Sequence, residues 1–237
     1  MKKYLTFVLM ILLTACDAVP APPTQVTIDS ATQPSAALTE IQIPTGYGYD
    51  GGWFELYFTD PTNPLSSQKT GGIDVPLANA IDSAKLSVDV AIYSLSLNSV
   101  RDALINAHHR GVQVRMVMES DNLDRTDAQK IKDAGIPILG DRREGLMHNK
   151  FVVIDASEVW LGTMNFTDSG TYEDNNAMIR IRSVKLAENF TKEFEEMFND
   201  DLFSDSVLAE TPNPRVTIDG IAVDTYFSPD DGVRRLS

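Results

Sequence analysis

The chain has 237 residues, of which 43% are hydrophobic and 23% charged, and its formal net charge is −14. Such a chain is long enough for one large domain or two small ones with a buried core. The excess of acidic residues repels polyanions, which argues against tight non-specific binding to DNA but still permits a local basic pocket.

The N-terminal part of the chain predicts secretion and a membrane anchor. Two lysines precede an apolar stretch at residues 5–13 that is too short to span a bilayer comfortably, as in a signal peptide at residues 1–15. The sequence Leu-Thr-Ala-Cys that follows resembles a bacterial lipobox, in which Cys16 becomes the lipidated first residue; the alternative is an ordinary secretory peptide. Residues 16–45, rich in Pro, Thr, Ser and Ala, are expected to form a flexible tether. We therefore expect an extracytoplasmic lipoprotein of the bacterial cell envelope.

From residue 53 onward, strand-like and helix-like patterns alternate. The expected elements, in chain order, are a strand at 53–60, a helix at 74–84, a strand at 85–95, a helix at 99–111, a strand at 112–119, a helix at 126–135, strands at 136–139, 150–155, 159–162 and 176–182, and a helix at 183–200. The last helix carries large apolar residues at helical spacing, which we expect in the core: Phe190, Phe194, Met197 and Phe198. This alternation indicates an α/β fold, in which helices cover a sheet.

A short repeat indicates one structural unit followed by the start of another. The string YFTDP at residues 57–61 and the string YFSPD at residues 226–230 both follow an apolar strand pattern. Five residues make a weak repeat, but recurrence in the same context is typical of duplicated units. We expect residues 46–204 to form the main domain, and residues 205–237 to be a linker and the opening strand of a second, missing repeat.

The most informative segment contains His148, one of three histidines in the chain, two residues before Lys150. In a strand these two side chains project from the same side, whereas Asp155 has the opposite parity and is expected to secure the far end of the strand. A neighbouring ammonium lowers the pKa of an imidazole and leaves its lone pair free, and the carboxamide of Asn165 adds a second group for phosphate oxygens. This pattern predicts a nucleophile with two oxyanion-stabilising groups rather than a capped strand end with a solvated lysine.

The run His148-Asn149-Lys150-Phe151-Val152-Val153-Ile154-Asp155, followed after six residues by Gly162-Thr163-Met164-Asn165, resembles the HxKxxxxD…GSxN signature of the phospholipase D superfamily. The similarity extends along residues 53–200. Thr163 stands where serine is usual, a change that keeps the hydroxyl.

The resemblance implies an α/β/α sandwich with a mixed central sheet, here one repeat plus the start of a second. In this family two HKD motifs meet at one active site, from two repeats or from two copies of a single-repeat chain. One histidine attacks phosphorus to form a phosphohistidine, and the other protonates the leaving alcohol and then activates water, without a metal or other cofactor. His148 is accordingly expected to be the nucleophile or the acid, Asp155 belongs to the motif, and Lys150, Asn165 and Thr163 are expected to bind the phosphate.

The family also implies a carboxylate that orients the histidine, near residues 172–177. Asn175 stands where some single-repeat members have glutamate, so Glu173 and Asp174 are the candidates to replace it. This departure favours the front half of a two-repeat enzyme over a self-sufficient dimer. Arg142 and Arg143, just before the motif, either extend a basic mouth for a second phosphate or form a solvated turn.

These features favour a phospholipase D-type phosphodiesterase that hydrolyses phospholipid headgroup phosphodiesters and is complete only with a second HKD motif. The alternatives are an extracytoplasmic nuclease of the same superfamily and a non-catalytic lobe that binds phosphate. The sequence leaves open the leaving alcohol, hydrolysis against transfer, and the source of the second motif.

Overall fold

The computed structural model describes residues 37–208, 210–229 and 231. Its main element is a nine-stranded sheet with the strand order β1-β2-β3-β9-β8-β7-β4-β5-β6. The sheet is mixed, because β4, β5 and β6 run parallel to one another while the other neighbouring strands pair antiparallel. Its strands are β1 (Thr39–Gln42), β2 (Tyr47–Asp50), β3 (Phe54–Phe58), β4 (Ser87–Ile92), β5 (Gln113–Met118), β6 (Ile138–Gly140), β7 (Lys150–Ile154), β8 (Glu158–Gly162) and β9 (Ala177–Arg182).

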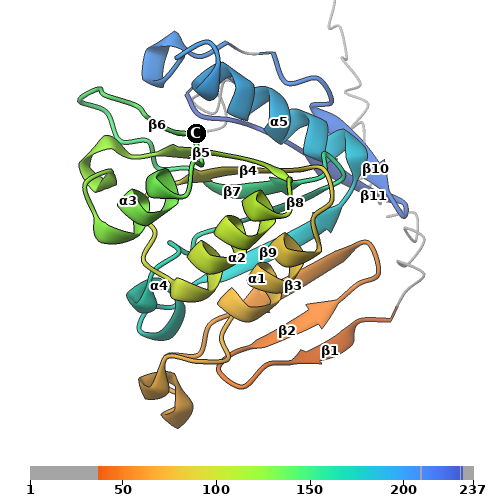
Figure 1. The fold of residues 1–237 in the computed structure, drawn as a ribbon. Coiled ribbons are helices and arrows are strands. Elements are labelled where there is room, and N and C mark those ends of the chain that lie inside the picture. Colours follow the sequence, from red (N-terminus) through yellow and green to blue (C-terminus); the bar gives the residue numbers. More distant parts are fainter. Residues whose placement is uncertain (1–36, 209, 230, 232–237) are drawn as a thin grey trace, which may run out of the picture. The chain divides into compact units, whose positions relative to one another are not determined.

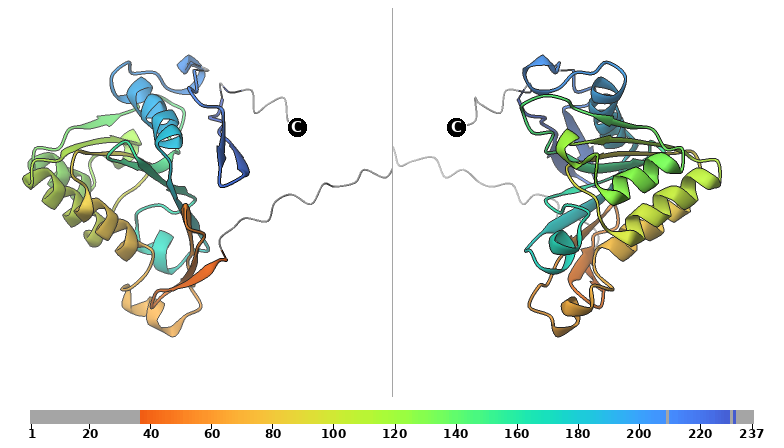
Figure 2. Two further views of the ribbon diagram at one scale, coloured as in Figure 1. Left: turned by 90° about the vertical axis from the view of Figure 1, so that its right-hand side faces the viewer. Right: turned by 60° about the vertical axis from the view of Figure 1, so that its left-hand side comes forward.

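Helices cover both faces of this sheet, as Figure 1 and Figure 2 show. The α-helices are α1 (Asp74–Ser83), α2 (Asn98–His109), α3 (Thr126–Asp133), α4 (Asp168–Tyr172) and α5 (Val184–Phe198), and the 3-10 turns are η1 (Pro64–Gln68), η2 (Ser120–Asn122) and η3 (Ser204–Ser206). The first three α-helices lie on one face, and α5 lies on the other. This arrangement confirms the expected α/β/α architecture with a mixed central sheet. Within the described residues, no helix has the length and apolar character needed to cross a bilayer.

Side chains of the central strand β7 point alternately into two cores. Val152 and Ile154 belong to the core beneath α1 and α2, whereas Phe151 and Val153 belong to the core beneath α5. A strand buried on both faces reads as a continuous apolar run, which is the pattern of this segment. The alternation matters for the site because β7 begins at Lys150.

An ion-pair network and a row of apolar side chains hold α5 on the sheet. Phe190, Phe194 and Met197 are buried there, as expected from their spacing. Arg115 of β5 forms ion pairs with Asp89 of β4 at 2.8 Å and with Glu195 of α5 at 2.7 Å. Because both carboxylates bind one largely buried guanidinium, the helix is fixed in register against the two strands.

The start of the sheet differs from the expectation of a tether up to residue 45. Thr39–Gln42 forms the edge strand β1, which pairs with β2. The apolar signal among these polar residues is short, with Ile41 and Ile43 packing against the core, which explains why composition alone indicated a flexible segment. The expected signal peptide and Cys16 lie outside the described residues.

The C-terminal segment also differs from a simple linker, because it packs against α5. Arg215–Ile218 (β10) and Ile221–Asp224 (β11) form an antiparallel hairpin. Asn189 of α5, which is fully buried, donates hydrogen bonds to the carbonyl of Asn213 at 2.8 Å and to the hydroxyl of Thr225 at 3.1 Å. Phe227, in the repeated Tyr-Phe string, packs edge-on against Phe190. A strand, β11, thus occupies the predicted position, while the second repeat that it was expected to open stays a prediction.

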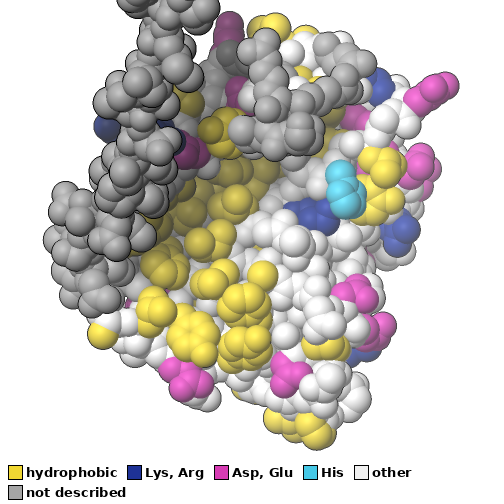
Figure 3. Space-filling view, turned by 180° about the vertical axis from the view of Figure 1, so that it is seen from behind, with side chains coloured by type: hydrophobic (Ala, Val, Ile, Leu, Met, Phe, Trp, Pro, Cys, Tyr) yellow, Lys and Arg dark blue, Asp and Glu magenta, His cyan; other side chains and the backbone are white. Residues whose placement is uncertain are grey.

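The sheet leaves part of its α5 face open. Figure 3 shows hydrophobic side chains gathered over this hollowed face, with a histidine and basic side chains at its margin. Half-buried apolar residues there include Phe54, Leu161 and Ile179.

Candidate active site

The candidate site lies along one edge of the sheet. Lys150 starts β7 at this edge, while β4 and β5 end there, and Gly162 ends the antiparallel strand β8 beside them. Loops that leave the carboxyl ends of parallel strands commonly carry functional groups in α/β folds. The two halves of the sequence motif, on β7 and after β8, are brought together in this way.

His148 and Lys150 meet around the ring of Tyr93, the residue that follows β4. The imidazole of His148 is exposed and contacts the tyrosine ring edge-on, with 5.1 Å between ring centroids. Lys150 is only 9% exposed, and its Nζ donates a hydrogen bond to the backbone carbonyl of His148 at 2.9 Å. The same Nζ lies 5.6 Å from the centroid of the Tyr93 ring. The ammonium is therefore held in place directly behind an accessible imidazole.

The surroundings favour the neutral form of His148. Partial desolvation lowers its pKa, the Lys150 ammonium lowers it further, and the carboxylate of Glu119 opposes both. Burial also lowers the pKa of Lys150. A neutral imidazole with a free lone pair beside a fixed cation is suited to nucleophilic attack on an anion.

Asn165 reaches the same region through a short pairing between two loops. Phe166 donates from its backbone N–H to the carbonyl of Ser94 at 3.1 Å, and Ser96 donates to the carbonyl of Phe166 at 2.7 Å. This pairing places Asn165 beside the residues that follow Tyr93. Its Oδ1 is buried and lacks a hydrogen-bond partner within the described residues, so this oxygen can still accept a hydrogen bond from a donor group.

The hydroxyl of Thr163 is already engaged. It donates to Oδ1 of Asn176 at 2.9 Å and accepts from the N–H of Ala177 at 3.1 Å. Gly162, directly before it, approaches the β9 backbone so closely that an added Cβ would lie 2.1 Å from the carbonyl oxygen of Ala177. Thr163 therefore fastens the motif loop to β9, and a phosphate contact through its hydroxyl proton requires that this hydrogen bond be given up.

Glu119 is the carboxylate next to His148. It follows β5, is 2% exposed and accepts a hydrogen bond at 2.8 Å from the backbone N–H of Met147, the residue before His148. The adjoining turn is tied in as well, because Ser120 donates from its N–H to Asp141 and Asn122 donates to the carbonyl of Tyr93. Sequence patterns did not single out this position, since a lone acid after a strand carries no spacing signal.

Comparison with known proteins identifies the family. A family profile described as "Cardiolipin synthase, PLD-like domain" matches residues 77–198, about half of the chain. The chain belongs to the phospholipase D superfamily. The matched residues include β7, both parts of the motif and the whole of α5.

Individual relatives of the superfamily align with the same region. A phospholipase D from Rickettsia conorii is 34% identical over 116 residues, which are 48% of this chain and 58% of the relative. A mitochondrial cardiolipin hydrolase from Chlamydomonas reinhardtii is 25% identical over 121 residues, which are 50% of this chain and 54% of the relative. The chain thus spans little more than half the length of these relatives.

A solved structure shares the fold. Nuc from Salmonella typhimurium, described as a phospholipase D family member, is 26% identical and superposes with a TM-score of 0.53 over 62% of this chain and 93% of its own.

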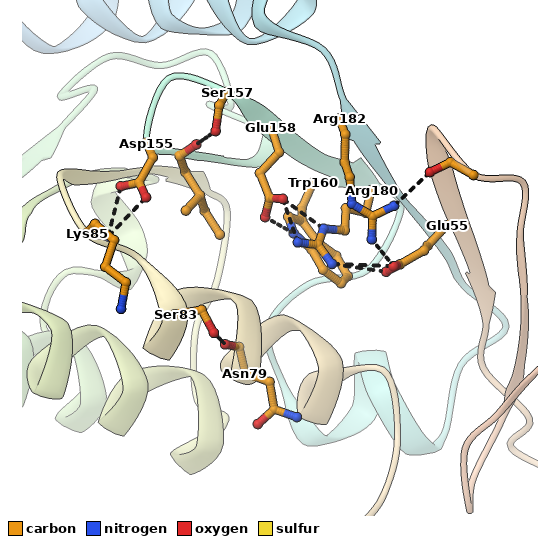
Figure 4. Close-up of polar contacts among 12 residues, drawn as sticks. Glu55, Asn79, Ser83, Lys85, Asp155, Ser157, Glu158, Trp160, Arg180 and Arg182 are labelled. Carbon is orange, nitrogen blue, oxygen red and sulfur yellow. Dashed lines mark hydrogen bonds and ion pairs between the residues drawn. The ribbon is translucent and has the colours of Figure 1, made fainter. Parts of the chain in front are cut away.

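Asp155, the aspartate of the phospholipase D motif, lies at the opposite end of β7 from Lys150. Figure 4 shows its carboxylate directed at the backbone around Lys85. Its carboxylate accepts hydrogen bonds from the N–H groups of Lys85, Leu86 and Ser87 at the start of β4. Partial burial raises the pKa of Asp155, but these N–H groups outweigh it and hold the pKa below its usual value. This position agrees with the parity argument and places the Asp155 carboxylate on the backbone before and at the start of β4, away from His148, although the sequence had listed it with the catalytic residues.

Replacing Asp155 with alanine is expected to lower the free energy of unfolding by roughly 2–3 kcal/mol at pH 7, since three N–H groups lose a charged acceptor. A carboxylate with a depressed pKa stabilises the fold above its unfolded pKa of about 3.9 and loses this contribution as the pH falls through the folded value. The difference between the two proteins in urea unfolding should therefore shrink below about pH 4. Asp82→Ala, which breaks an exposed ion pair with Arg110, is the control and should cost under about 1 kcal/mol. Equal losses in the two variants would contradict this role.

The carboxylates proposed to orient the histidine point elsewhere. Glu173 pairs with Lys69 at 3.2 Å and its side chain is 57% exposed. Asp174 is exposed, and its backbone carbonyl accepts a hydrogen bond from Thr59. Both follow α4, which the sequence did not predict and which turns them to the surface. Glu119 is the carboxylate that raises the pKa of His148, and it accepts a hydrogen bond from the backbone N–H of Met147.

Both arginines of the basic pair before the motif bind the same aspartate. Arg142 and Arg143 both form ion pairs with Asp201, at 2.7 and 3.2 Å. Arg143 also stacks over the ring of Phe203. Both guanidinium groups are thus engaged in ion pairs. This favours the turn, one of the two alternatives for these residues, over a basic mouth for a second phosphate.

Glu119→Gln is expected to lower the pKa of His148. The substitution removes a negative charge that favours the imidazolium, while the carboxamide oxygen still accepts from the N–H of Met147. The measurement is an NMR titration of the imidazole Cε1–H, with His108 and His109 as internal references and His148→Ala for assignment. An unchanged or raised pKa would show that Glu119 acts on the loop without influencing the charge of the ring.

Proposed function

We propose that the chain supplies one half of a phospholipase D-type active site that hydrolyses lipid phosphodiesters, with His148 as the nucleophile. The observation that carries this proposal is the accessible imidazole of His148, whose own backbone carbonyl accepts a hydrogen bond from the buried ammonium of Lys150 and whose pKa that ammonium lowers. Family membership supports the chemistry. The lipid-related names of the relatives, a phospholipase D and a cardiolipin hydrolase, support a lipid substrate, as does the chain's negative charge.

The proposed reaction has two steps. An imidazole nitrogen of His148 forms a bond to phosphorus, and the bond from phosphorus to the leaving alcohol breaks as the alcohol takes a proton from the histidine of a second HKD motif. That second histidine then removes a proton from water, which attacks phosphorus and releases His148 and a phosphomonoester. Lys150 and Asn165 stabilise the charge on the non-bridging oxygens in both steps.

A single motif supplies only one of the two histidines that this reaction needs. We propose that the second comes from a further repeat or from a second copy of the chain. We also propose that Cys16, outside the described residues, is lipidated and holds the domain at the membrane of the cell envelope, where its substrate lies.

The test compares three substrates over a range of protein concentrations: bis(4-nitrophenyl) phosphate, dioleoylphosphatidylcholine vesicles and single-stranded DNA. The expected result is release of phosphatidic acid without scission of DNA. A rate per chain that rises with concentration would indicate pairing of two copies. Cleavage of DNA alone would favour the nuclease function, and phosphate binding without turnover at any concentration would favour a non-catalytic lobe.

A further inference from the structure

A pocket of about 460 Å³ opens beside His148, on the α5 side of the site. Its lining comes from the loop before β7, from α5, from the segment around η3 and from the residues after β11. The lining residues include Asp141, Arg143, Leu146, Met147, Glu193, Met197, Phe203, Val207 and Pro229.

One wall of this pocket lies outside the region shared with the family. The family profile ends at residue 198, whereas Phe203, Val207 and Pro229 come later in the chain. Phe203 and Val207 lie in a segment tied to α5 by hydrogen bonds from the N–H groups of Leu202 and Leu208 to Glu196. Pro229 follows Phe227, which packs against Phe190 of α5. The wall is thus a feature of this chain's own C-terminal segment.

The pocket offers apolar contacts rather than a second phosphate site. Met147, Met197 and Phe203 supply apolar atoms to the lining, and each is at most 5% exposed. Among the described residues that line the pocket, the one arginine or lysine is Arg143. It forms an ion pair with Asp201 at 3.2 Å.

The other charged groups of the lining are carboxylates. The carboxylate of Asp141 accepts from the N–H of Ser120, and Glu193 adds a second acid. The lining thus holds more acidic than basic side chains, which disfavours a second phosphate in this pocket.

We infer that this pocket binds an acyl arm of a phosphatidyl group while its phosphate lies at His148 and Lys150. The inference rests on the proposed function and narrows its substrate to lipid phosphodiesters with one phosphate. Flexible Met side chains suit a chain of variable length and conformation. Burial of a few methylene groups here adds on the order of ten-fold or more to affinity.

The experiment measures binding, so that it does not depend on a second HKD motif. The full chain is titrated calorimetrically with dihexanoylphosphatidic acid and with glycerol 3-phosphate, which carry the same phosphate with and without acyl arms. The variants are Val207→Asp, which places a charge in the lining, and Leu208→Asp, the same change at a neighbouring residue that is 48% exposed and outside the lining.

The unmodified chain should bind dihexanoylphosphatidic acid at least about ten-fold more tightly than glycerol 3-phosphate. Val207→Asp should abolish this preference and leave the affinity for glycerol 3-phosphate unchanged, and Leu208→Asp should retain the preference. No preference in the unmodified chain, equal effects of the two variants, or loss of glycerol 3-phosphate binding in Val207→Asp would each overturn the inference.

The proposed function is scored separately, by hydrolysis of bis(4-nitrophenyl) phosphate, which has no acyl arm. If that hydrolysis is absent and the acyl preference is present, the enzyme function fails while the pocket assignment stands. If hydrolysis is present without the preference, the pocket assignment fails alone.

Discussion

His148→Ala is expected to lower the rate of phosphodiester hydrolysis by at least about a thousand-fold, because no other group in the described site can form the bond to phosphorus. His148 is exposed, so its removal leaves the core and the hydrogen bonds of β7 intact. The fold should therefore be unaffected. The measurement is kcat/KM with bis(4-nitrophenyl) phosphate, together with thermal unfolding.

The matched control is His109→Ala, which removes an exposed imidazole from the last turn of α2. It should leave both the rate and the unfolding temperature unchanged. Retention of more than about a tenth of the rate in His148→Ala would contradict a nucleophilic role, whatever the control shows.

Lys150→Met is expected to lower kcat/KM by roughly 10²–10³-fold, the usual loss when one preorganised stabiliser of a developing charge is removed. Methionine preserves the length of the buried chain, and removing a buried ammonium that has no carboxylate partner among the described residues relieves a desolvation cost. The variant should thus be at least as stable as the parent. Loss of the nearby cation also favours the imidazolium, so the pKa of His148 should rise.

These two effects together separate an electrostatic role of Lys150 from a merely structural one. The control Lys85→Met removes an exposed ammonium at the start of β4 and should change neither the rate nor the titration of His148. A Lys150→Met protein with an unchanged His148 pKa would show that the ammonium does not act on the imidazole.

Those parts of the fold and of the site that depend on the local spacing of residues could be predicted from the sequence. Strand alternation placed β7 and set Lys150 and Asp155 at opposite ends, and helical spacing identified Phe190, Phe194 and Met197 as core. These predictions were confirmed because the burial of each residue follows from the period of its own element.

The rest depends on contacts between distant segments. Glu119 reaches Met147 only because β5 and the loop before β7 end at the same edge of the sheet. Tyr93 contacts both His148 and Lys150 for the same reason, because β4 also ends at this edge of the sheet. Glu173 and Asp174 were expected near the histidine, but the unforeseen turn of α4 carries them to the surface. The strand β1 was missed because its residues are mostly polar and exposed.

The most direct test of the central claim is a trapping experiment with a substrate that carries a radioactive phosphate. The active protein is quenched with denaturant at alkaline pH during turnover and digested, and the labelled peptide is sequenced. We expect a phosphoryl label on the imidazole of His148, and we expect this label to be absent in His148→Ala. Steady turnover with the label on another residue, or with no labelled peptide, would contradict it.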